Sequence, residues 1–133
     1  MRAPHRTLLP PGWPRPKGYA NGIAAQGRLI VTGGIIGWDT DERLVANDLV
    51  GQFRQVLANT LAVLGEGGAG PEHIVRMTWY ITDRDDYVAN LAAIGEVYRE
   101  LIGRNYPAMA VLQVAGLIEP DALVEIETMA VVP

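Results

Sequence analysis

The two apolar segments that end the chain constrain its fold more than any other feature. Residues 108–117 and 123–132 are rich in β-branched and other apolar residues, so we predict a β-strand for each. Both faces of each strand carry mostly apolar side chains, and Gln113 is the exception in the first strand. A strand that is apolar on both faces needs a cover on each side. Helices can supply one cover and another subunit the second, so the pattern predicts a homo-oligomer.

The middle of the chain predicts a helix followed by a strand. Apolar residues recur at helical spacing after Asn47 or Asp48, and either of these residues can cap the helix. The helix is expected to run to about Leu64 and to stop at Gly65. Residues 74–82 are β-branched and aromatic, which predicts a strand.

Further elements are expected on both sides of these two. Asp83 is the expected N-cap of a second helix, which ends near Gly103. Nearer the N-terminus, residues 18–25 and 28–33 predict a β-hairpin with its turn at residues 26–27.

The resulting order of elements is ββ-α-β-α-ββ. Hairpins that flank single helices favour an α+β domain with a mixed sheet and both helices on one face. Four prolines lie between residues 8 and 17. Because proline fixes φ and lacks a backbone N–H, residues 1–16 are predicted to form an extended N-terminal arm. Residues 17–133 are predicted to form a single domain, as expected at this length.

Missing residue types exclude several classes of function. The chain has no cysteine and no serine, which excludes disulfides, thiolate metal sites and cysteine or serine nucleophiles. His5 and His73 are too few for a multi-histidine metal site within one subunit. A net charge of −4 and a single lysine, Lys17, argue against nucleic-acid binding. No apolar run reaches the roughly 18 residues of a membrane span. We therefore expect a cytoplasmic protein with no bound metal, nucleic acid or membrane.

Two glutamates interrupt the last, otherwise apolar strand. Alternation puts Glu125 and Glu127 on the same face, about 7 Å apart. Two like charges on a half-buried face are costly unless each finds a partner or a water-filled cavity. The pair is therefore either a set of surface acids or part of a pocket between subunits, in which one acid transfers protons.

A series of short segments carries a resemblance to a known family. The segments are Tyr19-Ala20-Asn21-Gly22, Val31-Thr32-Gly33-Gly34, Gln52 to Asn59, Thr82-Asp83, Tyr106-Pro107-Ala108, Leu123-Val124-Glu125-Ile126-Glu127 and Ala130-Val131. In this order and spacing they resemble the RidA or YjgF-like family of reactive-intermediate deaminases over residues 17–132. The resemblance implies a chorismate-mutase-like α+β fold and a homotrimer with clefts between subunits. Active members hydrolyse enamines and imines, such as 2-aminoacrylate, to a 2-keto acid and ammonia, without a cofactor.

The resemblance also implies roles for individual residues. Glu125 matches the acid that positions the attacking water, and Tyr19 matches a tyrosine that closes the cleft. Thr32, Gly33 and Gly34 match a segment whose backbone groups hold the substrate.

One position departs from the family pattern in a way that bears on the substrate. Met109 stands where active members have an arginine that binds the substrate carboxylate, and methionine cannot form that charge-assisted pair. Val111 stands at the place of a frequent cysteine, and Gln113 lies on the same strand face. Leu91 aligns with the family's cleft asparagine. The candidates to supply the charge from elsewhere are Arg76, Arg84 and Arg104.

Two hypotheses about function follow from this departure. The first is a deaminase that acts on C=N bonds of a non-standard substrate, with Met109, Val111 and Gln113 among the residues that bind it. The second is a non-catalytic trimeric protein that binds a small ligand in the cleft between subunits. The low positive charge argues against a third activity attached to the family, RNA cleavage.

Overall fold

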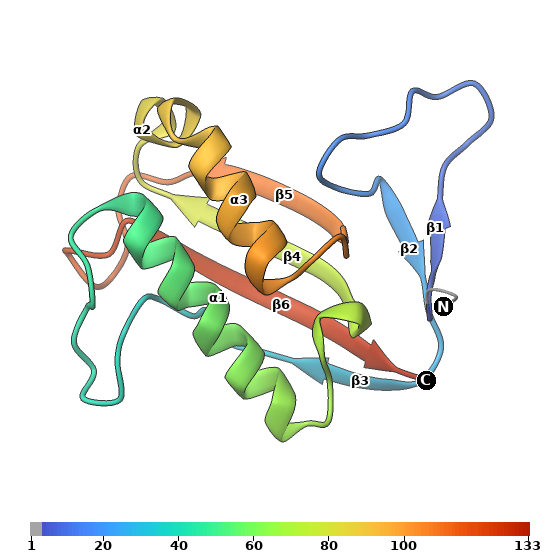
Figure 1. Ribbon diagram of the computed structural model, residues 1–133, viewed down its shortest axis with the longest axis horizontal. Coiled ribbons are helices and arrows are strands. Elements are labelled where there is room, and N and C mark those ends of the chain that lie inside the picture. Colours follow the sequence, from blue (N-terminus) through green and yellow to red (C-terminus); the bar gives the residue numbers. More distant parts are fainter. Residues whose placement is uncertain (1–3) are drawn as a thin grey trace.

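Four strands form the main sheet, in the order β3-β6-β4-β5, and the helices α1 and α3 cover one of its faces (Figure 1). The computed structural model describes residues 4–133. In chain order the elements are β1 (Arg6–Leu8), β2 (Gly22–Ala24), β3 (Arg28–Val31), α1 (Leu49–Glu66), η1 (Pro71–His73), β4 (Ile74–Ile81), α2 (Arg84–Ala89), α3 (Leu91–Leu101), β5 (Ala108–Gln113) and β6 (Val124–Val132).

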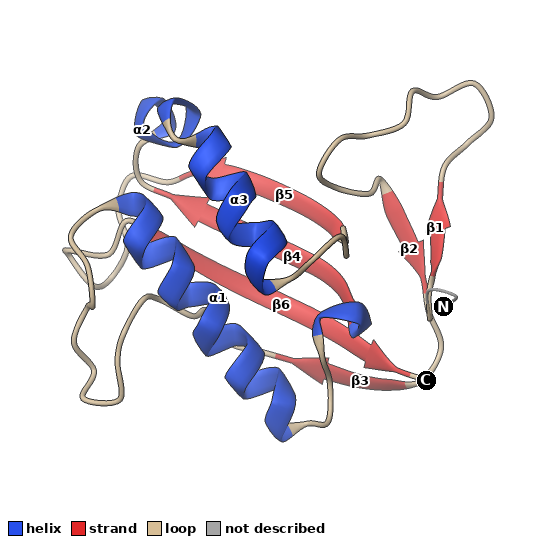
Figure 2. Cartoon of the chain, viewed as in Figure 1, coloured by secondary structure: helices blue, strands red, loops and turns tan. Residues whose placement is uncertain are grey.

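The main sheet mixes parallel and antiparallel pairs. Strands β4 and β5 are parallel, whereas β6 is antiparallel to both β3 and β4. Figure 2 shows the helices on one side of this sheet and the strands β1 and β2 apart from it. The predicted α+β architecture, with a mixed sheet and helices on one face, is therefore confirmed.

Strand pairing differs from the prediction at the N-terminal end. β2 pairs with β1, which lies in the proline-rich arm, and β3 pairs with β6, so the predicted hairpin of residues 18–25 and 28–33 is wrong. Gly27, expected in the turn, has a φ of 144°, and a Cβ there would lie 2.1 Å from the carbonyl oxygen of Val132. The turn therefore packs directly against the end of β6, and β3 pairs with β6 from its first residue.

Pairing at the C-terminal end differs as well. The expected hairpin of the last two strands is wrong, because β5 lies at the sheet edge beside β4, and β6 lies between β4 and β3. The physical reason is the crossover from β4 through α2 and α3, which returns the chain parallel to β4 and places β5 on its free side.

The first helix begins as expected and ends slightly later. Asp48 is the N-cap, and its carboxylate accepts a hydrogen bond from the Gly51 N–H at 3.1 Å. The helix ends at Glu66 rather than at Gly65, because the N–H groups of the next residues, among them Gly68 with a φ of 78°, bond back to its last carbonyls.

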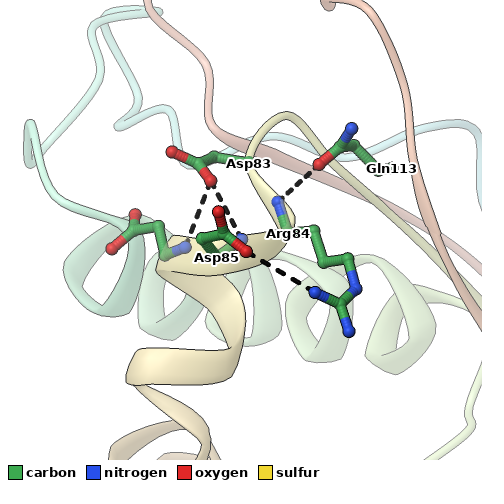
Figure 3. Close-up of polar contacts among 5 residues, drawn as sticks. Asp83, Arg84, Asp85 and Gln113 are labelled. Carbon is green, nitrogen blue, oxygen red and sulfur yellow. Dashed lines mark hydrogen bonds and ion pairs between the residues drawn. The ribbon is translucent and has the colours of Figure 1, made fainter.

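The second predicted helix is divided into α2 and α3. Asp83 caps α2 as predicted, accepting hydrogen bonds from the N–H groups of Asp85 and Asp86 at 3.0 and 3.2 Å (Figure 3). The division falls at Asn90, whose side-chain amide donates to the carbonyl and the carboxylate of Asp86. Such local hydrogen bonds compete with a continuous helix.

An aromatic row links the helices to the sheet. The rings of Phe53 and Trp79 lie 4.9 Å apart, and those of Trp79 and Tyr98 lie 6.0 Å apart. Tyr98 also stacks on Tyr106 at 5.8 Å, and its hydroxyl donates to the carbonyl of Asn105 at 2.5 Å. Burial, and to a lesser degree Tyr106, raises the pKa of Tyr98 above the ordinary tyrosine value.

Because of this raised pKa, we expect Tyr98→Phe to flatten the loss of stability at alkaline pH. Below about pH 10, tyrosine is protonated in both the folded and the unfolded chain. Above it, the unfolded chain ionises while folded Tyr98 stays protonated, so the free energy of unfolding falls as pH rises. At neutral pH the variant should be less stable by about 1 kcal/mol, because the hydrogen bond to Asn105 is lost.

Urea unfolding of both proteins between pH 7 and 11 measures this effect. The difference in unfolding free energy between wild type and Tyr98→Phe should shrink above pH 10. Parallel curves over the whole range would show that Tyr98 does not contribute to the alkaline limb.

The face of the sheet that turns away from the helices has no cover within residues 4–133. Apolar side chains on this face are exposed, with Leu29 60%, Val31 55%, Leu112 45% and Met129 41% accessible. The other face of β6 is fully buried, at Val124, Ile126 and Ala130. One face of the sheet is thus covered by helices, and the other, which carries these apolar side chains together with Tyr80, Glu125 and Glu127, is open.

Candidate functional site

Glu125 lies beside a glycine that makes room for its carboxylate. It is half-buried on β6 and faces away from the helices, since its neighbour Ile126 points into the core. A Cβ on Gly34 would lie 2.4 Å from a carboxylate oxygen of Glu125. The reciprocal backbone hydrogen bonds between Ile35 and Ile126, at 2.9 and 3.0 Å, fix this approach. Any larger residue at position 34 would push Glu125 away.

Glu127 shares the face of Glu125, as alternation predicted, but has a different environment. Tyr80 of β4 donates a hydrogen bond to the Glu127 carboxylate. This hydrogen bond, together with burial and the negative charges of Glu127 and Glu125, raises the pKa of Tyr80. Glu127 is therefore engaged by a tyrosine, whereas the Glu125 carboxylate accepts no hydrogen bond from residues 4–133.

The segment that precedes Gly34 is held by the hydroxyl of Thr32. This hydroxyl donates to the carbonyl of Gly33 at 2.7 Å and accepts from the N–H of Thr128 at 3.1 Å. Gly33 and Gly34 are both exposed, and their backbone N–H groups donate no hydrogen bond within residues 4–133. The Thr32 side chain thus holds the backbone of this segment against β6. The two glycines offer free N–H donors beside Glu125.

Glu125 and Gly34 line a hollow of about 660 Å³ at the β3 side of the sheet. Asn59 of α1 is part of its wall, and its side-chain amide donates to the carbonyls of Ile36 and Trp38. Three acids line this hollow and no lysine or arginine does; the acids are Asp39, Glu119 and Glu125.

A second pocket, of about 360 Å³, contains Tyr19, Met109 and Val111. Ala20 brings Tyr19 there, because its N–H donates to the Pro107 carbonyl at 2.9 Å, at the start of β5. The pocket wall also includes the aromatic side chains of Trp79, Tyr87, Tyr98 and Tyr106. Tyr19, Met109 and Val111, which the sequence nominated separately, thus lie together.

Gln113 lies outside both hollows. Its side-chain oxygen accepts a hydrogen bond from the backbone N–H of Arg84 at 2.6 Å, at the start of α2 (Figure 3). Gln113 therefore joins the end of β5 to the start of α2. Arg84 itself is 3.5 Å from Asp85.

None of the three arginines named from the sequence lines the Met109 pocket; these are Arg76, Arg84 and Arg104. Two other cationic residues do, Lys17 and Arg99, and the sequence reasoning missed Arg99. Leu91, at the place of the family's cleft asparagine, lines the pocket as well, whereas Asn90 is bonded to Asp86. Leu91, Gly95 and Arg99 recur at helical spacing, and this is the sequence signal that would have led to Arg99.

The two hollows lie at opposite sides of the main sheet. Tyr19, Met109 and Val111 adjoin β5, the strand at one edge, whereas Glu125 and Gly34 adjoin β3, at the other (Figure 1). The two hollows also lie on different faces of the sheet. Val111 is the register partner of Trp79, which points into the core, whereas Glu125 is the register partner of Tyr80, the next residue of β4, which points to the opposite face. A single chain therefore keeps the candidate catalytic acid apart from the Met109 pocket.

The described residues offer no group of three or more histidine, cysteine, aspartate or glutamate side chains suited to hold a metal ion. Among the helices of residues 4–133, none combines the length and the hydropathy that crossing a membrane requires.

Comparisons with known proteins agree with this arrangement of elements. The sequence model of the family described as Endoribonuclease L-PSP matches residues 14–132. RutC family protein slr0709 of Synechocystis sp. is 37% identical over 123 residues, which are 90% of this chain and 91% of that protein.

Solved structures give the same assignment. YyfB of Yersinia pestis, a member of the conserved Rid protein family, superposes with a TM-score of 0.86 at 31% identity, over 97% of this chain and 99% of that chain. TdcF of E. coli, solved with bound serine, superposes with a TM-score of 0.68 at 28% identity, over 100% of this chain and 97% of that chain. The chain belongs to the RidA/YjgF-like family.

Proposed function

We propose that the protein hydrolyses an imine, or an enamine through its imine form, to a keto compound and ammonia, on a substrate other than the family's usual one. The observation that carries this proposal is Glu125, a half-buried carboxylate seated on Gly34 beside the free N–H groups of Gly33 and Gly34. A carboxylate without a hydrogen-bond donor of its own is suited to bind and orient a water molecule.

The chemistry requires few groups. An enamine becomes an imine when its carbon is protonated, and the imine carbon is then open to attack by water. Glu125 takes a proton from the attacking water as the C–O bond to the protonated imine forms, and it passes this proton to the nitrogen of the resulting carbinolamine. The C–N bond then breaks and ammonia leaves, while the carbinolamine hydroxyl gives its proton to Glu125 and becomes the keto C=O. In this proposal the N–H groups of Gly33 and Gly34 hold a polar substrate group, and Tyr19, which lines the Met109 pocket, covers the cleft from a neighbouring subunit. No step needs a cofactor.

We propose further that the working unit is a homotrimer whose site is shared between subunits. Support comes from the separation of the two hollows, since Glu125 and Met109 lie at opposite sides of one sheet. Exposed apolar side chains on the uncovered face, among them Val31 and Met129, offer a surface for association. A Glu125 hollow of one subunit set against the Met109 pocket of the next would complete one cleft.

A non-catalytic, ligand-binding trimer is the second candidate. Met109 favours it, because an apolar side chain at this place removes the family's carboxylate contact while leaving a pocket of about 360 Å³. In this case the protein would bind a small molecule without accelerating hydrolysis.

The substitution Met109→Arg separates the two candidates. We expect the wild type to hydrolyse 2-aminoacrylate poorly, and Met109→Arg to raise kcat/KM by about tenfold or more, because a charge-assisted pair with the substrate carboxylate is restored. The measurement generates 2-aminoacrylate from serine with a dehydratase and follows pyruvate and ammonia. Val88→Arg, at an exposed position of α2 outside both hollows, is the matched control and should give no gain. If Met109→Arg gains nothing and neither protein accelerates hydrolysis, the ligand-binding candidate is favoured.

A further inference from the structure

The Met109 pocket contains positive charge and no negative charge. Lys17 and Arg99 are among its lining residues, and no aspartate or glutamate is. The Glu125 hollow has the opposite composition, with three acids and no lysine or arginine. In a chain with a net charge of −4, this separation marks the Met109 pocket as a place that favours an anion.

The position of Arg99 is built into α3. Leu91, Gly95 and Arg99 are spaced by four residues, so they lie along one stripe of the helix, and all three line the pocket. A Cβ on Gly95 would lie 3.2 Å from a guanidinium nitrogen of Arg99. Glycine is unfavourable inside a helix, and here it leaves the space in which the guanidinium lies along the pocket wall.

The guanidinium of Arg99 is available to a ligand. Within residues 4–133, Arg99 makes no ion pair, and its sequence neighbour Glu100 is bound to Arg54 instead. An arginine offers a planar pair of donors, which matches the two oxygens of a carboxylate.

The rest of the pocket wall indicates what the anion is attached to. The wall is largely aromatic and aliphatic, with Tyr87, Tyr106 and Val111 among its members, and about 360 Å³ suits a small organic molecule. Burial raises the pKa of Tyr87, so its phenol stays neutral and can donate a hydrogen bond. The indole N–H of Trp79 is buried in the same wall and has no acceptor within residues 4–133.

We propose that Arg99 determines specificity in this pocket by binding the carboxylate of a small substrate with an apolar or aromatic body. This inference rests on the proposed function only for the chemical group of the substrate that reacts. The binding of a carboxylate by Arg99 does not depend on it. Arg99 approaches from the helix, whereas an arginine at position 109 would approach from strand β5. A carboxylate bound by Arg99 therefore lies at a different point of the pocket from one bound at position 109.

Binding of two matched probes to the full-length protein tests the proposal. Phenylpyruvate is a 2-keto acid, the product class of imine hydrolysis, and phenylacetone is its analogue without the carboxylate. Isothermal titration should show that phenylpyruvate binds and that Arg99→Gln weakens it about tenfold or more, with less than about a twofold effect on phenylacetone. Arg99→Lys should recover part of the affinity, since it keeps the charge but not the planar donors.

Arg104→Gln is the control, because Arg104 is exposed and lies outside the pocket. It should leave both affinities unchanged. Equal affinity of wild type and Arg99→Gln for phenylpyruvate, or no phenylpyruvate binding by the wild type, would overturn the proposal. Binding is measured without turnover, so a protein that binds phenylpyruvate through Arg99 but hydrolyses no imine would contradict only the proposed function.

Discussion

Replacing Glu125 by glutamine is expected to lower the rate of imine hydrolysis by about 100- to 10,000-fold, the usual contribution of general acid–base catalysis. Glutamine has nearly the shape of glutamate, so it can keep the close approach to Gly34 that fixes the side chain. It cannot accept a proton from water at neutral pH. The loss should therefore appear in kcat, with the affinity for a product such as phenylpyruvate nearly unchanged.

Glu127→Gln provides the matched control for this experiment. Glu127 lies two residues away on the same strand and face, but its carboxylate is bound by Tyr80. We expect it to retain activity within about threefold of the wild type, since the glutamine amide oxygen can still accept the hydrogen bond from Tyr80 and only an exposed charge is lost. Equal rates for wild type and Glu125→Gln would contradict the assignment of Glu125 as the catalytic base. An equal loss in both variants would indicate a general effect of removing charge from this face.

Local signals in the sequence predicted local structure well. Asp83 was predicted as a cap and Asp48 as one of two candidates, and both are caps, because a cap depends on a side chain and the next two or three N–H groups. Alternation placed Glu125 and Glu127 on one face for a similar reason. The division at Asn90 was missed, although it is also local, because the apolar stripe continues past it.

Strand pairing could not be predicted in the same way. A Gln-Gly dipeptide between two strand-like segments suggests a hairpin, but the competing partner of β3 is β6, about a hundred residues further along the chain. No residue near Gly27 in the sequence indicates that the backbone of Val132 packs against it, in the space that a side chain would occupy. Pairing at this range is decided by the packing of the complete domain.

The candidate site shows the same limit. The resemblance identified Glu125, Tyr19 and Met109 as candidate site residues one by one. The sequence does not show which of them lie in the same hollow of one chain. The spacing of Leu91, Gly95 and Arg99 was visible as a helical stripe. What this stripe faces depends on where α3 lies over the sheet, and only the tertiary structure places it beside Met109.

A second large effect is expected from a charge on the open face of the sheet. Met129 is 41% exposed there and pairs with Val31 of β3, which is 55% exposed. If this face is the subunit interface, Met129→Glu buries a carboxylate beside Glu127. Arg76, the register partner of Met129 on β4, offsets part of the cost, which is on the order of 3–5 kcal/mol for an unpaired buried charge. Light scattering at micromolar concentration should show a trimer for the wild type and monomers for the variant. Because Glu125 and Met109 lie apart in one chain, the monomer should also lose hydrolysis.

Val88→Glu shows whether the effect belongs to the face rather than to the added charge. Val88 is 48% exposed on α2, outside both hollows, so this variant should remain trimeric and active. A monomeric wild type, or a monomeric Met129→Glu with full activity, would contradict the shared site.

A separate experiment distinguishes a site shared between subunits from an interface that only stabilises each subunit. Mixed trimers decide this. Glu125→Gln alone is expected to be at least about 100-fold less active, and Met109→Trp alone to lose activity because the indole fills space in the pocket of about 360 Å³. A mixture of the two chains can form a cleft with one intact hollow from each. Recovered activity in the mixture therefore requires that Glu125 and the Met109 pocket of one working site come from different subunits.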